Sequence, residues 1–428
     1  MKILSTFLIL CFVCLLTGPP KGNPNYDFKA SIINALEFRH RDTGVYNSMV
    51  ANSLCTSGYY QDARHYDSLG RTFRSVKDLY FSEWDFKEAD KIILENADKY
   101  RVTMFNEEHM RPEHRLFVKR MLAPLRQKGY SILMVEGLKY FNELSKNPCP
   151  VSTDGKYINE PNYAQLLRYA KRLGYSVYAY EAHTTTTWDD SIKLDKYGSM
   201  KYIAYNPPDS MSKIYDQNGL KEYIFSGERE NQQALNAYSV IRQHPNAKVV
   251  MMVGVKHISK DETMMQGQLN KMLHDSIITF DQTDLNNTAN FINAGTSDTL
   301  KARMPLIAMN KATGKTYHIP SSFPPDVDFN IINEMVYDSL GRPSYLFKDP
   351  EKRKTYYLPK TILKKSPILV TAYYTNELEQ FREKAIAVDI FQYDNADQKI
   401  PLLLFPADYT IVYKESNGEF HQYQVKIK

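Results

Sequence analysis

The chain has 428 residues, of which 43% are hydrophobic and 24% are charged. This composition excludes fibrous, collagen-like and wholly disordered proteins, and the length allows two or three cores. Lys and Arg total 54 against 49 for Asp and Glu, and the two signs are mostly interleaved, so we expect no nucleic acid partner.

The N-terminus predicts export. Lys2 precedes an apolar run at residues 3–16 that ends at Thr-Gly-Pro-Pro. A membrane-spanning helix needs about 20 apolar residues, so the run is typical of a secretory signal peptide, which we place at 1–22. No later stretch is long and apolar enough to span a bilayer, and we expect a periplasmic or extracellular protein without a transmembrane anchor. Cys11 and Cys14 leave a lipoprotein anchor as an alternative, although neither follows the small residue that such a site needs.

Two further cysteines are Cys55 and Cys149. In an oxidising compartment they could form a disulfide or remain two separate thiols, and nothing in the sequence brings them together.

Residues 27–95 carry apolar side chains at three- and four-residue steps, which predicts a helical lead-in. From 96 to 290, short β-rich runs alternate with amphipathic helical segments. This alternation is typical of a parallel sheet covered on both faces, so we predict an α/β core there. The expected strands are 101–105, 131–135, 176–180, 248–253 and 276–280, and the expected helices are 112–128, 161–173, 230–244 and 261–273.

Two segments depart from this rhythm. Residues 189–227 are Tyr-rich, contain Pro-Pro and are too long for an ordinary connection, so we expect a lid or a substrate-contacting insertion. Residues 300–428 predict a small β-rich C-terminal domain. Its expected strands are 368–374, 385–393, 401–405, 409–414 and 422–427. The predicted fold is therefore α/β, a mostly parallel sheet flanked by helices, with the helical lead-in and the C-terminal domain attached.

Glu or His follows each of four consecutive predicted strands of the core. The first strand ends in Asn-Glu-Glu-His at 106–109, the second at Glu136, the third in Glu-Ala-His at 181–183 and the fourth in Gly-Val-Lys-His at 254–257. Ligands of open parallel sheets bind beyond the carboxyl ends of the strands, so these residues predict a shared functional cleft.

Three of these residues suggest roles in proton transfer. Glu136 ends an apolar run, where it is either a carboxylate with a tuned pKa or a buried acid held by backbone N–H groups or an Arg. His109 precedes a predicted helix whose positive end favours the neutral imidazole of a general base, with Glu107 or Glu136 to orient it; the alternative is a loop histidine. His257 follows Gly254, which allows a sharp turn, and is otherwise a helix-capping or solvent histidine.

Five residues are expected to bind substrate or support this set: His114, Arg115, Glu181, His183 and Arg229. Arg229 could recognise a carboxylate or phosphate, or form a surface ion pair. His114 and Arg115 could do no more than pair with nearby acids.

The same strand ends offer a mixed nitrogen and oxygen ligand set for a metal: Glu107, His109, Glu136 and His257. The sequence has no H-E-x-x-H motif, and the step from His109 to His114 does not place both rings on one helix face, so we assert no metal. It also has no G-x-S-x-G elbow and no glycine-rich nucleotide loop, which argues against serine hydrolase chemistry and nucleotide cofactors.

These segments resemble a pattern in which one strand ends in G-E-x-H or G-x-x-H, a second ends in Glu, and a late strand ends in G-x-G-H. The matching segments here are 106–109, 135–138 and 253–257, with Asn106 and Lys256 where the pattern has glycine. On this basis the chain resembles the superfamily of erythromycin esterase-like hydrolases, ChaN-like haem-uptake proteins and Tiki/TraB-type proteins, and within it a subgroup of secreted bacterial proteins. The resemblance covers most of the predicted α/β core.

The resemblance implies an active site made of Glu107, His109, Glu136 and His257. Esterase-like members imply water activated by the counterpart of His109 without a metal, Tiki-type members imply a divalent metal and peptide cleavage, and haem-uptake members bind haem. Our leading hypothesis is a secreted hydrolase of a small-molecule or peptide ester, lactone or amide that requires no cofactor, with His257 stabilising the oxyanion or protonating the leaving group. The alternatives are a haem- or metal-binding protein without esterase activity and a non-catalytic surface module.

Overall fold

The structure is a computed structural model. It describes residues 22–35, 43–69, 77–139, 142, 144–184, 202–203, 226–274, 276–283, 285, 289–292, 299–300, 302–318 and 326–428. The predicted signal peptide lies outside the described residues except for Gly22. The predicted insertion at 189–227 also lies outside them, apart from β7 (Tyr202–Ile203), which pairs with β6 (His183–Thr184), and the start of α9 (Ser226–Gln243).

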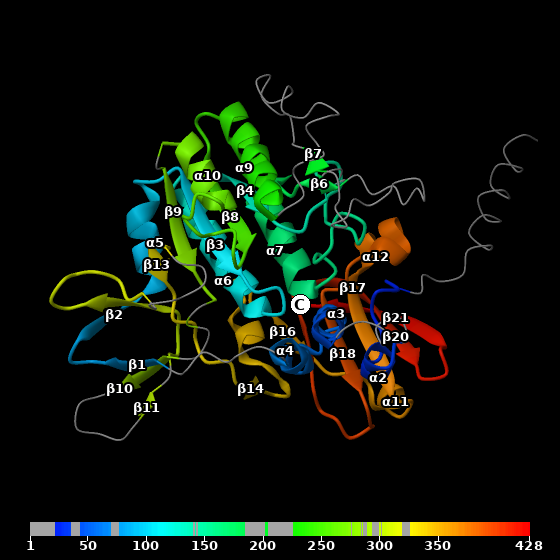
Figure 1. Ribbon diagram of the computed structural model, residues 1–428. Helices are drawn as coiled ribbons and strands as arrows, with labels where there is room; N and C mark the ends of the chain where they lie inside the picture. Colours follow the sequence, from blue (N-terminus) through cyan, green and yellow to red (C-terminus); the bar gives the residue numbers. More distant parts are fainter. Residues whose placement is uncertain are drawn as a thin grey trace, which may run out of the picture.

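A six-stranded sheet forms the centre of the described structure, and all its neighbouring strands run parallel (Figure 1). In spatial order the strands are β13 (Phe329–Asn330), β9 (Ile277–Asp281), β3 (Val102–Glu107), β8 (Lys248–Gly254), β4 (Tyr130–Val135) and β5 (Ser176–Ala179). All except β13 lie close to strands expected from the sequence, and the predicted α/β class is confirmed. The edge strand β13 comes from chain that we assigned to the C-terminal domain, because a two-residue strand has no periodic pattern to recognise.

Helices cover both faces of this sheet. Successive residues of each strand point to opposite sides, so each apolar strand has side chains to bury on both faces. In β3, Phe105 packs on the side of α5 (Ala89–Ala97), α6 (Pro112–Gln127) and α7 (Pro161–Arg172). Met104 packs on the side of α9 and α10 (Met265–Met272). Each large apolar side chain that becomes fully buried there stabilises the fold by about 1.5–3 kcal/mol.

The predicted lead-in is largely helical, as expected. Its helices are α2 (Lys29–Ile33), α3 (Thr43–Thr56), α4 (Tyr60–Ser68) and α5. It also contains two strands that we did not predict, β1 (Lys77–Tyr80) and β2 (Trp84–Glu88). Their partners, β10 (Ala289–Ile292) and β12 (Leu306–Asn310), lie far along the chain, so local sequence carries no sign of the pairing. β11 (Thr299–Leu300) completes the sheet of β1 and β10.

The C-terminal region is β-rich, as predicted. An antiparallel sheet of order β18-β17-β20-β21 lies beside α2 and α3 in Figure 1. Its strands are β17 (Ile368–Tyr374), β18 (Asp389–Tyr393), β20 (Ala407–Glu415) and β21 (Phe420–Ile427), and β16 (Lys354–Tyr356) pairs with β19 (Leu402–Leu404). The remaining short elements are β14 (Asp338–Ser339), β15 (Arg342–Pro343), α11 (Lys360–Leu363), α12 (Thr375–Phe381) and the 3₁₀ helices Ser344–Lys348 and Arg382–Lys384.

Buried ion pairs join this region to the helices of the central sheet. Lys119 of α6 donates from Nζ to Asp349 Oδ1 at 2.8 Å, and Arg168 of α7 donates from Nε to Glu377 Oε1 at 3.0 Å. All four side chains are buried. Because breaking a buried pair typically costs about 3–5 kcal/mol, these contacts fix the C-terminal region against α6 and α7.

Cys55 and Cys149 are both buried and free. Of the two alternatives that the sequence left open, the structure therefore has the separate thiols.

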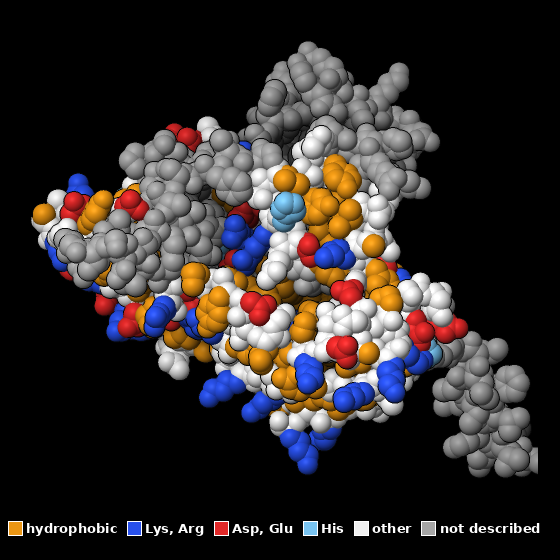
Figure 2. All heavy atoms as spheres, turned by 90° about the horizontal axis from the view of Figure 1, so that it is seen from below, with side chains coloured by type: hydrophobic (Ala, Val, Ile, Leu, Met, Phe, Trp, Pro, Cys, Tyr) orange, Lys and Arg blue, Asp and Glu red, His pale blue; other side chains and the backbone are white. Residues whose placement is uncertain are grey.

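The face in Figure 2 carries Lys and Arg side chains interspersed with acidic and hydrophobic ones. Within the described ranges, no helix combines the length and the apolar character needed to cross a bilayer.

Candidate functional site

The carboxyl ends of β3, β4 and β8 meet at one edge of the sheet and bring together most of the predicted residues. Glu107 is the last residue of β3 and faces Gly254, the last residue of β8, in the strand register. Glu136 follows β4, and its side chain accepts a hydrogen bond from the Gly254 N–H. His257 lies in the turn after β8, with its N–H bonded to the Gly254 carbonyl at 3.2 Å. The parallel arrangement thus gathers residues from three separate loops.

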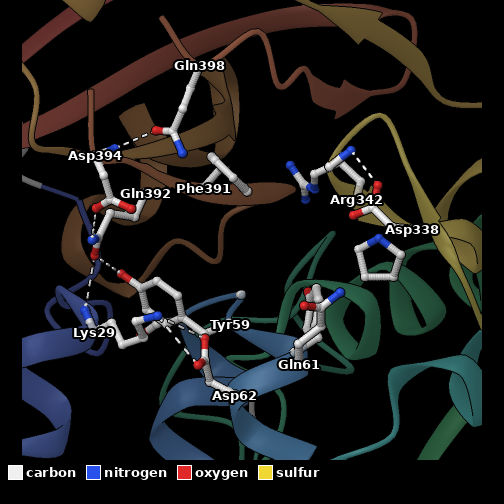
Figure 3. Close-up of a pocket in the computed structure, with 15 residues that line it drawn as sticks. Lys29, Tyr59, Gln61, Asp62, Asp338, Arg342, Phe391, Gln392, Asp394 and Gln398 are labelled. Atoms are coloured by element: carbon white, nitrogen blue, oxygen red, sulfur yellow. Dashed lines mark hydrogen bonds and ion pairs between the residues drawn. The ribbon is translucent and has the colours of Figure 1, made fainter. Parts of the chain in front are cut away.

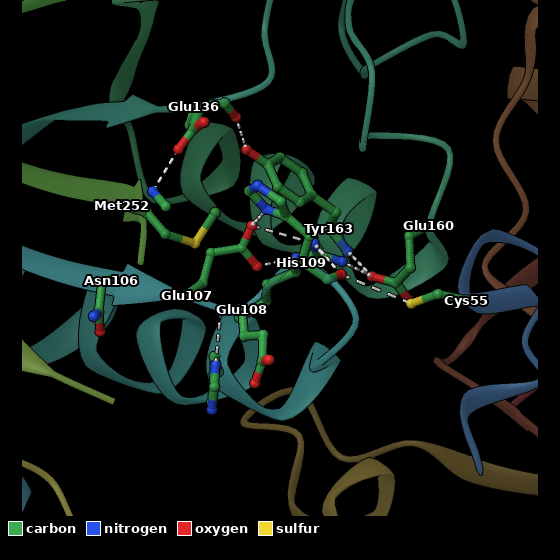
Figure 4. A network of polar contacts seen from close by, with 12 residues as sticks. Cys55, Asn106, Glu107, Glu108, His109, Glu136, Glu160, Tyr163 and Met252 are labelled. Atoms are coloured by element: carbon green, nitrogen blue, oxygen red, sulfur yellow. Dashed lines mark hydrogen bonds and ion pairs between the residues drawn. The ribbon is translucent and has the colours of Figure 1, made fainter. Parts of the chain in front are cut away.

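The first half of the site is a network of hydrogen bonds and ion pairs around His109 (Figure 4). Glu107 is 1% exposed; its Oε1 lies 2.7 Å from His109 Nδ1 and its Oε2 accepts a hydrogen bond from Arg115 Nε at 2.7 Å. Arg115 also donates to the His109 carbonyl oxygen at 2.8 Å and to Glu160 Oε2 at 3.0 Å. Both the ring and the backbone of His109 are therefore held in place.

The charge of Glu107 sets the state of the His109 ring. Burial by itself raises the pKa of the Glu107 carboxyl, but Arg115 and the hydrogen bond from His109 outweigh it and lower the pKa to about 2. The carboxylate can only accept hydrogen bonds, so it favours the neutral tautomer with hydrogen on Nδ1. The lone pair of that tautomer is on Nε2, at the opposite edge of the ring.

The second half of the site surrounds Glu136. Its Oε1 accepts a hydrogen bond from Arg229 Nη2 at 2.9 Å and lies 3.5 Å from His257 Nε2. His257 Nδ1 lies 2.7 Å from Glu230 Oε2. Burial raises the pKa of Glu136, yet His257 and the other cations hold it well below its usual range. Glu136 is therefore a buried acid held by a backbone N–H and an Arg, and its pKa is also strongly lowered. Both alternatives that the sequence offered for Glu136 describe it in part.

The imidazole of His257 has a raised pKa although the ring is buried. Burial lowers its pKa, but the carboxylates of Glu136 and Glu230 outweigh burial and raise the pKa to about 9. Arg229 Nη1 also lies 3.1 Å from His257 Nε2. The carboxylates of Glu136 and Glu230 thus favour the protonated imidazole, whereas the Arg229 guanidinium opposes it.

Two tyrosines connect the halves. Tyr163 donates from its hydroxyl to the Glu136 carbonyl oxygen, and its ring lies 4.7 Å from the Arg115 guanidinium carbon. Tyr157 stacks on His109 with ring centres 4.0 Å apart and an interplanar angle of 20°.

His109 opens onto a cavity of about 310 Å³, and its side chain is 26% exposed. The described residues that line the cavity are Ser48, Met49, Asn52, Ser53, Asp67, Glu108, His109, Met110, Lys156, Tyr157 and Val255. The wall therefore combines the loop after β3 with one side of α3.

The remaining predicted residues lie around this centre. His114 is buried, and its Nδ1 accepts the Glu108 N–H at 3.1 Å, so it holds the loop after β3. Glu181 binds Arg229 through both oxygens, at 3.0 and 2.6 Å, which commits Arg229 to carboxylates of the chain itself. His183 is the first residue of β6, and its side chain lies outside the described part of the structure.

Several residues of the site were not predicted. Glu160 caps α7 just before Pro161, a recognisable helix start, but its reach to Arg115 is a tertiary contact with no local signal. Glu230 and Tyr157 likewise come from positions without a motif.

Asn106, where the resemblance has glycine, accepts the Gln282 N–H at 2.6 Å and donates to Thr283 Oγ1 at 3.1 Å, so it joins the ends of β3 and β9.

The metal candidates do not gather their ligand atoms. Within the described residues, only one group of three acidic or imidazole side chains has ligand atoms all within 4.8 Å of one another, and it lies elsewhere, at Glu415, Glu419 and His421. At the site itself, Glu107 and Glu136 are each bound by a guanidinium, and His109 Nδ1 by a carboxylate. These residues therefore do not fit a divalent metal in the observed arrangement.

The raised pKa of His257 predicts a pH-dependent stability. Its folded pKa of about 9 exceeds the ordinary value of 6.5, so the stabilisation is complete below about pH 6.5 and is lost as the pH rises through 9. The free energy of unfolding, measured by urea denaturation, should fall over this interval in the parent and fall less in His257→Asn. An exposed-histidine variant, His65→Asn, should behave like the parent; an equal fall in all three would contradict the assignment.

Comparison with protein-family models and with curated proteins finds no match. Two solved structures are weakly similar. The type III effector HopBA1 has a TM-score of 0.26 and 15% identity over 46% of this chain and 83% of its own. ChaN of Campylobacter jejuni, in a structure described as cofacial heme binding, has a TM-score of 0.27 and 12% identity over 48% of this chain and 92% of its own. Likeness at this level establishes no function, and the resemblance to the superfamily stays a prediction.

Proposed function

We propose that the protein is an exported hydrolase in which His109 activates water for attack on an ester, lactone or amide. The observation that supports this most is the contact of 2.7 Å between His109 Nδ1 and the buried carboxylate of Glu107, in a ring that is partly exposed to a cavity. A histidine that is oriented by a buried carboxylate and partly exposed to a cavity is the arrangement of a general base.

The proposed reaction uses each side chain in a distinct way. Water gives a proton to His109 Nε2 while its oxygen bonds to the carbonyl carbon, and Glu107 stabilises the imidazolium that forms. Arg115 keeps Glu107 ionised and oriented from within the protein. The bond between the carbonyl carbon and the leaving oxygen or nitrogen then breaks, and the proton passes from His109 to that leaving atom.

For the second half we propose a supporting role in place of the oxyanion or leaving-group role that we expected for His257. The side chain of His257 is only 7% exposed, whereas that of Arg229, which lies against it, is 32% exposed. Arg229 is also engaged by the carboxylates of Glu136 and Glu181. We therefore give His257 and Arg229 the supporting role of holding the Glu136 carboxylate at the end of β4.

The proposal is tested with the full chain on a panel of 4-nitrophenyl esters, lactones and amides, with added haem as a parallel arm. Turnover of at least one class supports the hydrolase. An inactive protein that gives a Soret band with haem would support the haem-binding alternative. A protein that neither hydrolyses any of the substrates nor binds haem would overturn both proposals and favour the non-catalytic surface module.

Replacing Gly254 by Ala should damage the site without removing any catalytic group. A Cβ at this position would lie 2.6 Å from Glu136 Oε2 and 3.2 Å from His257 Cδ2, so Glu136 must move. Since displacements of about 1 Å can cost about 10²-fold, we expect kcat/KM to fall by about that factor. Gly418→Ala is the control: a Cβ there meets no atom within 4 Å, and the φ of +90° means that the change strains only the turn between β20 and β21. It should therefore lower stability and leave kcat/KM unchanged; equal activity of both variants would count against the role of Glu136.

A further inference from the structure

The cavity in front of His109 has a wall of uncharged polar side chains. Ser48, Asn52 and Ser53 line it from α3, at spacings that place them on one side of the helix. Ser48 is exposed and the other two are half-buried. In the part of the chain that the structure describes, none of their side chains is hydrogen-bonded to another residue, so their hydroxyl and amide groups are available to a ligand.

The charges of the lining do not suit an anion. Lys156 brings one positive charge, against the two carboxylates of Asp67 and Glu108. Glu108 Oε2 is paired with Arg111 Nε at 3.2 Å, and no described arginine lines the cavity. The described lining therefore has fewer cations than carboxylates and offers no excess of positive charge to a phosphate or a carboxylate-bearing ligand.

The volume of the cavity and the apolar part of its lining further restrict the kinds of ligand that fit. A volume of about 310 Å³ is at the lower end of the range of about 300–1,000 Å³ for small-molecule sites. Met49, Met110 and Val255 give an apolar surface near His109 that suits a short acyl chain. Hydroxyl groups elsewhere on the ligand would bind the α3 side chains.

We infer that the substrate is a small uncharged ester rich in hydroxyl groups, of the acylated-sugar class, and that α3 recognises its hydroxyls through Asn52 and Ser53. This rests on the proposed function, because it names the substrate of the same site. In the reaction, the oxygen of water bonds to the acyl carbon, the ester C–O bond breaks, and the proton taken by His109 passes to the sugar oxygen that leaves.

The test compares three acetyl esters with the full chain: a methyl 6-O-acetylglucoside, an acetylated glucuronic acid and 4-nitrophenyl acetate. The parent should hydrolyse the neutral sugar ester with at least about tenfold higher kcat/KM than the uronic acid ester. Asn52→Leu and Ser53→Ala should each raise KM for the sugar ester about 2- to 10-fold, the value of one hydrogen bond, and leave 4-nitrophenyl acetate unchanged. Thr43→Val, an exposed α3 position outside the cavity, is the matched control.

The possible failures are distinguishable. If hydrolysis of 4-nitrophenyl acetate depends on His109 but the α3 variants change neither ester, or change both equally, the substrate inference is wrong and the proposed function stands. A preference for the uronic acid ester would also overturn the inference. If none of the three esters is hydrolysed, the inference fails together with the esterase function.

Discussion

His109→Ala should lose hydrolytic activity by about 10²- to 10⁴-fold in kcat/KM, the usual value of a general base. The side chain is partly exposed and contributes little to the core, so the melting temperature should change little. Steady-state kinetics on the best ester, with circular dichroism and thermal melting of both proteins, would measure this.

His65→Ala is the matched control for this change, because His65 is an exposed histidine of α4 that is not among the described residues lining the cavity. It should retain the activity of the parent. Parent-like turnover by His109→Ala would remove the mechanism, even if the protein remained a hydrolase.

Arg115→Met is expected to cause the largest loss of stability. Arg115 is 1% exposed and binds two buried carboxylates, Glu107 and Glu160, so its removal leaves both without their main cation. Breaking buried pairs of this kind costs about 3–5 kcal/mol, and we expect the free energy of unfolding to fall by that amount in urea or thermal denaturation.

Arg111→Met tests whether this effect comes from burial. Arg111 is also close to two carboxylates, Glu108 and Glu113, but its side chain is 24% exposed. Its loss should cost about 1 kcal/mol or less. Equal destabilisation by the two variants would show that the Glu107 network is not a buried electrostatic centre.

The site is connected to the C-terminal region by a continuous polar network. Glu160, which binds Arg115, also accepts hydrogen bonds from Tyr60 at 2.9 Å and from the Asn162 amide at 2.7 Å. Asn162 Oδ1 in turn accepts Arg353 Nη2 at 2.8 Å. Side chains from α4, α7 and the C-terminal region therefore support the position of His109.

The sequence predicted the sheet well, because strands buried on both faces form continuous apolar runs. It also predicted that residues at the ends of β3, β4 and β8 lie at one edge of the sheet, and it left open whether Glu107 or Glu136 orients His109. The structure has Glu107 in contact with the ring and Glu136 in contact with Arg229.

Arg115 shows what the sequence could not reveal. Its spacing from His109 suggested a peripheral residue, yet the first turn of α6 returns its side chain beneath the end of β3, and this depends on how the helix is rotated against the sheet. Glu160 and Tyr157 come from the irregular chain between β4 and α7, where no periodicity constrains side-chain direction. Two-residue strands such as β13 are lost for the same reason.

The protonation of the His109 ring is the most direct test of the account. Nitrogen-15 NMR of histidine-labelled protein, with the signals assigned by comparison with His109→Ala, distinguishes the two neutral tautomers. We predict hydrogen on Nδ1 and an unprotonated Nε2 in the neutral ring, and loss of this preference in Glu107→Gln. A neutral ring with hydrogen on Nε2, or a tautomer unaffected by Glu107→Gln, would contradict the claim that Glu107 prepares His109 as a base.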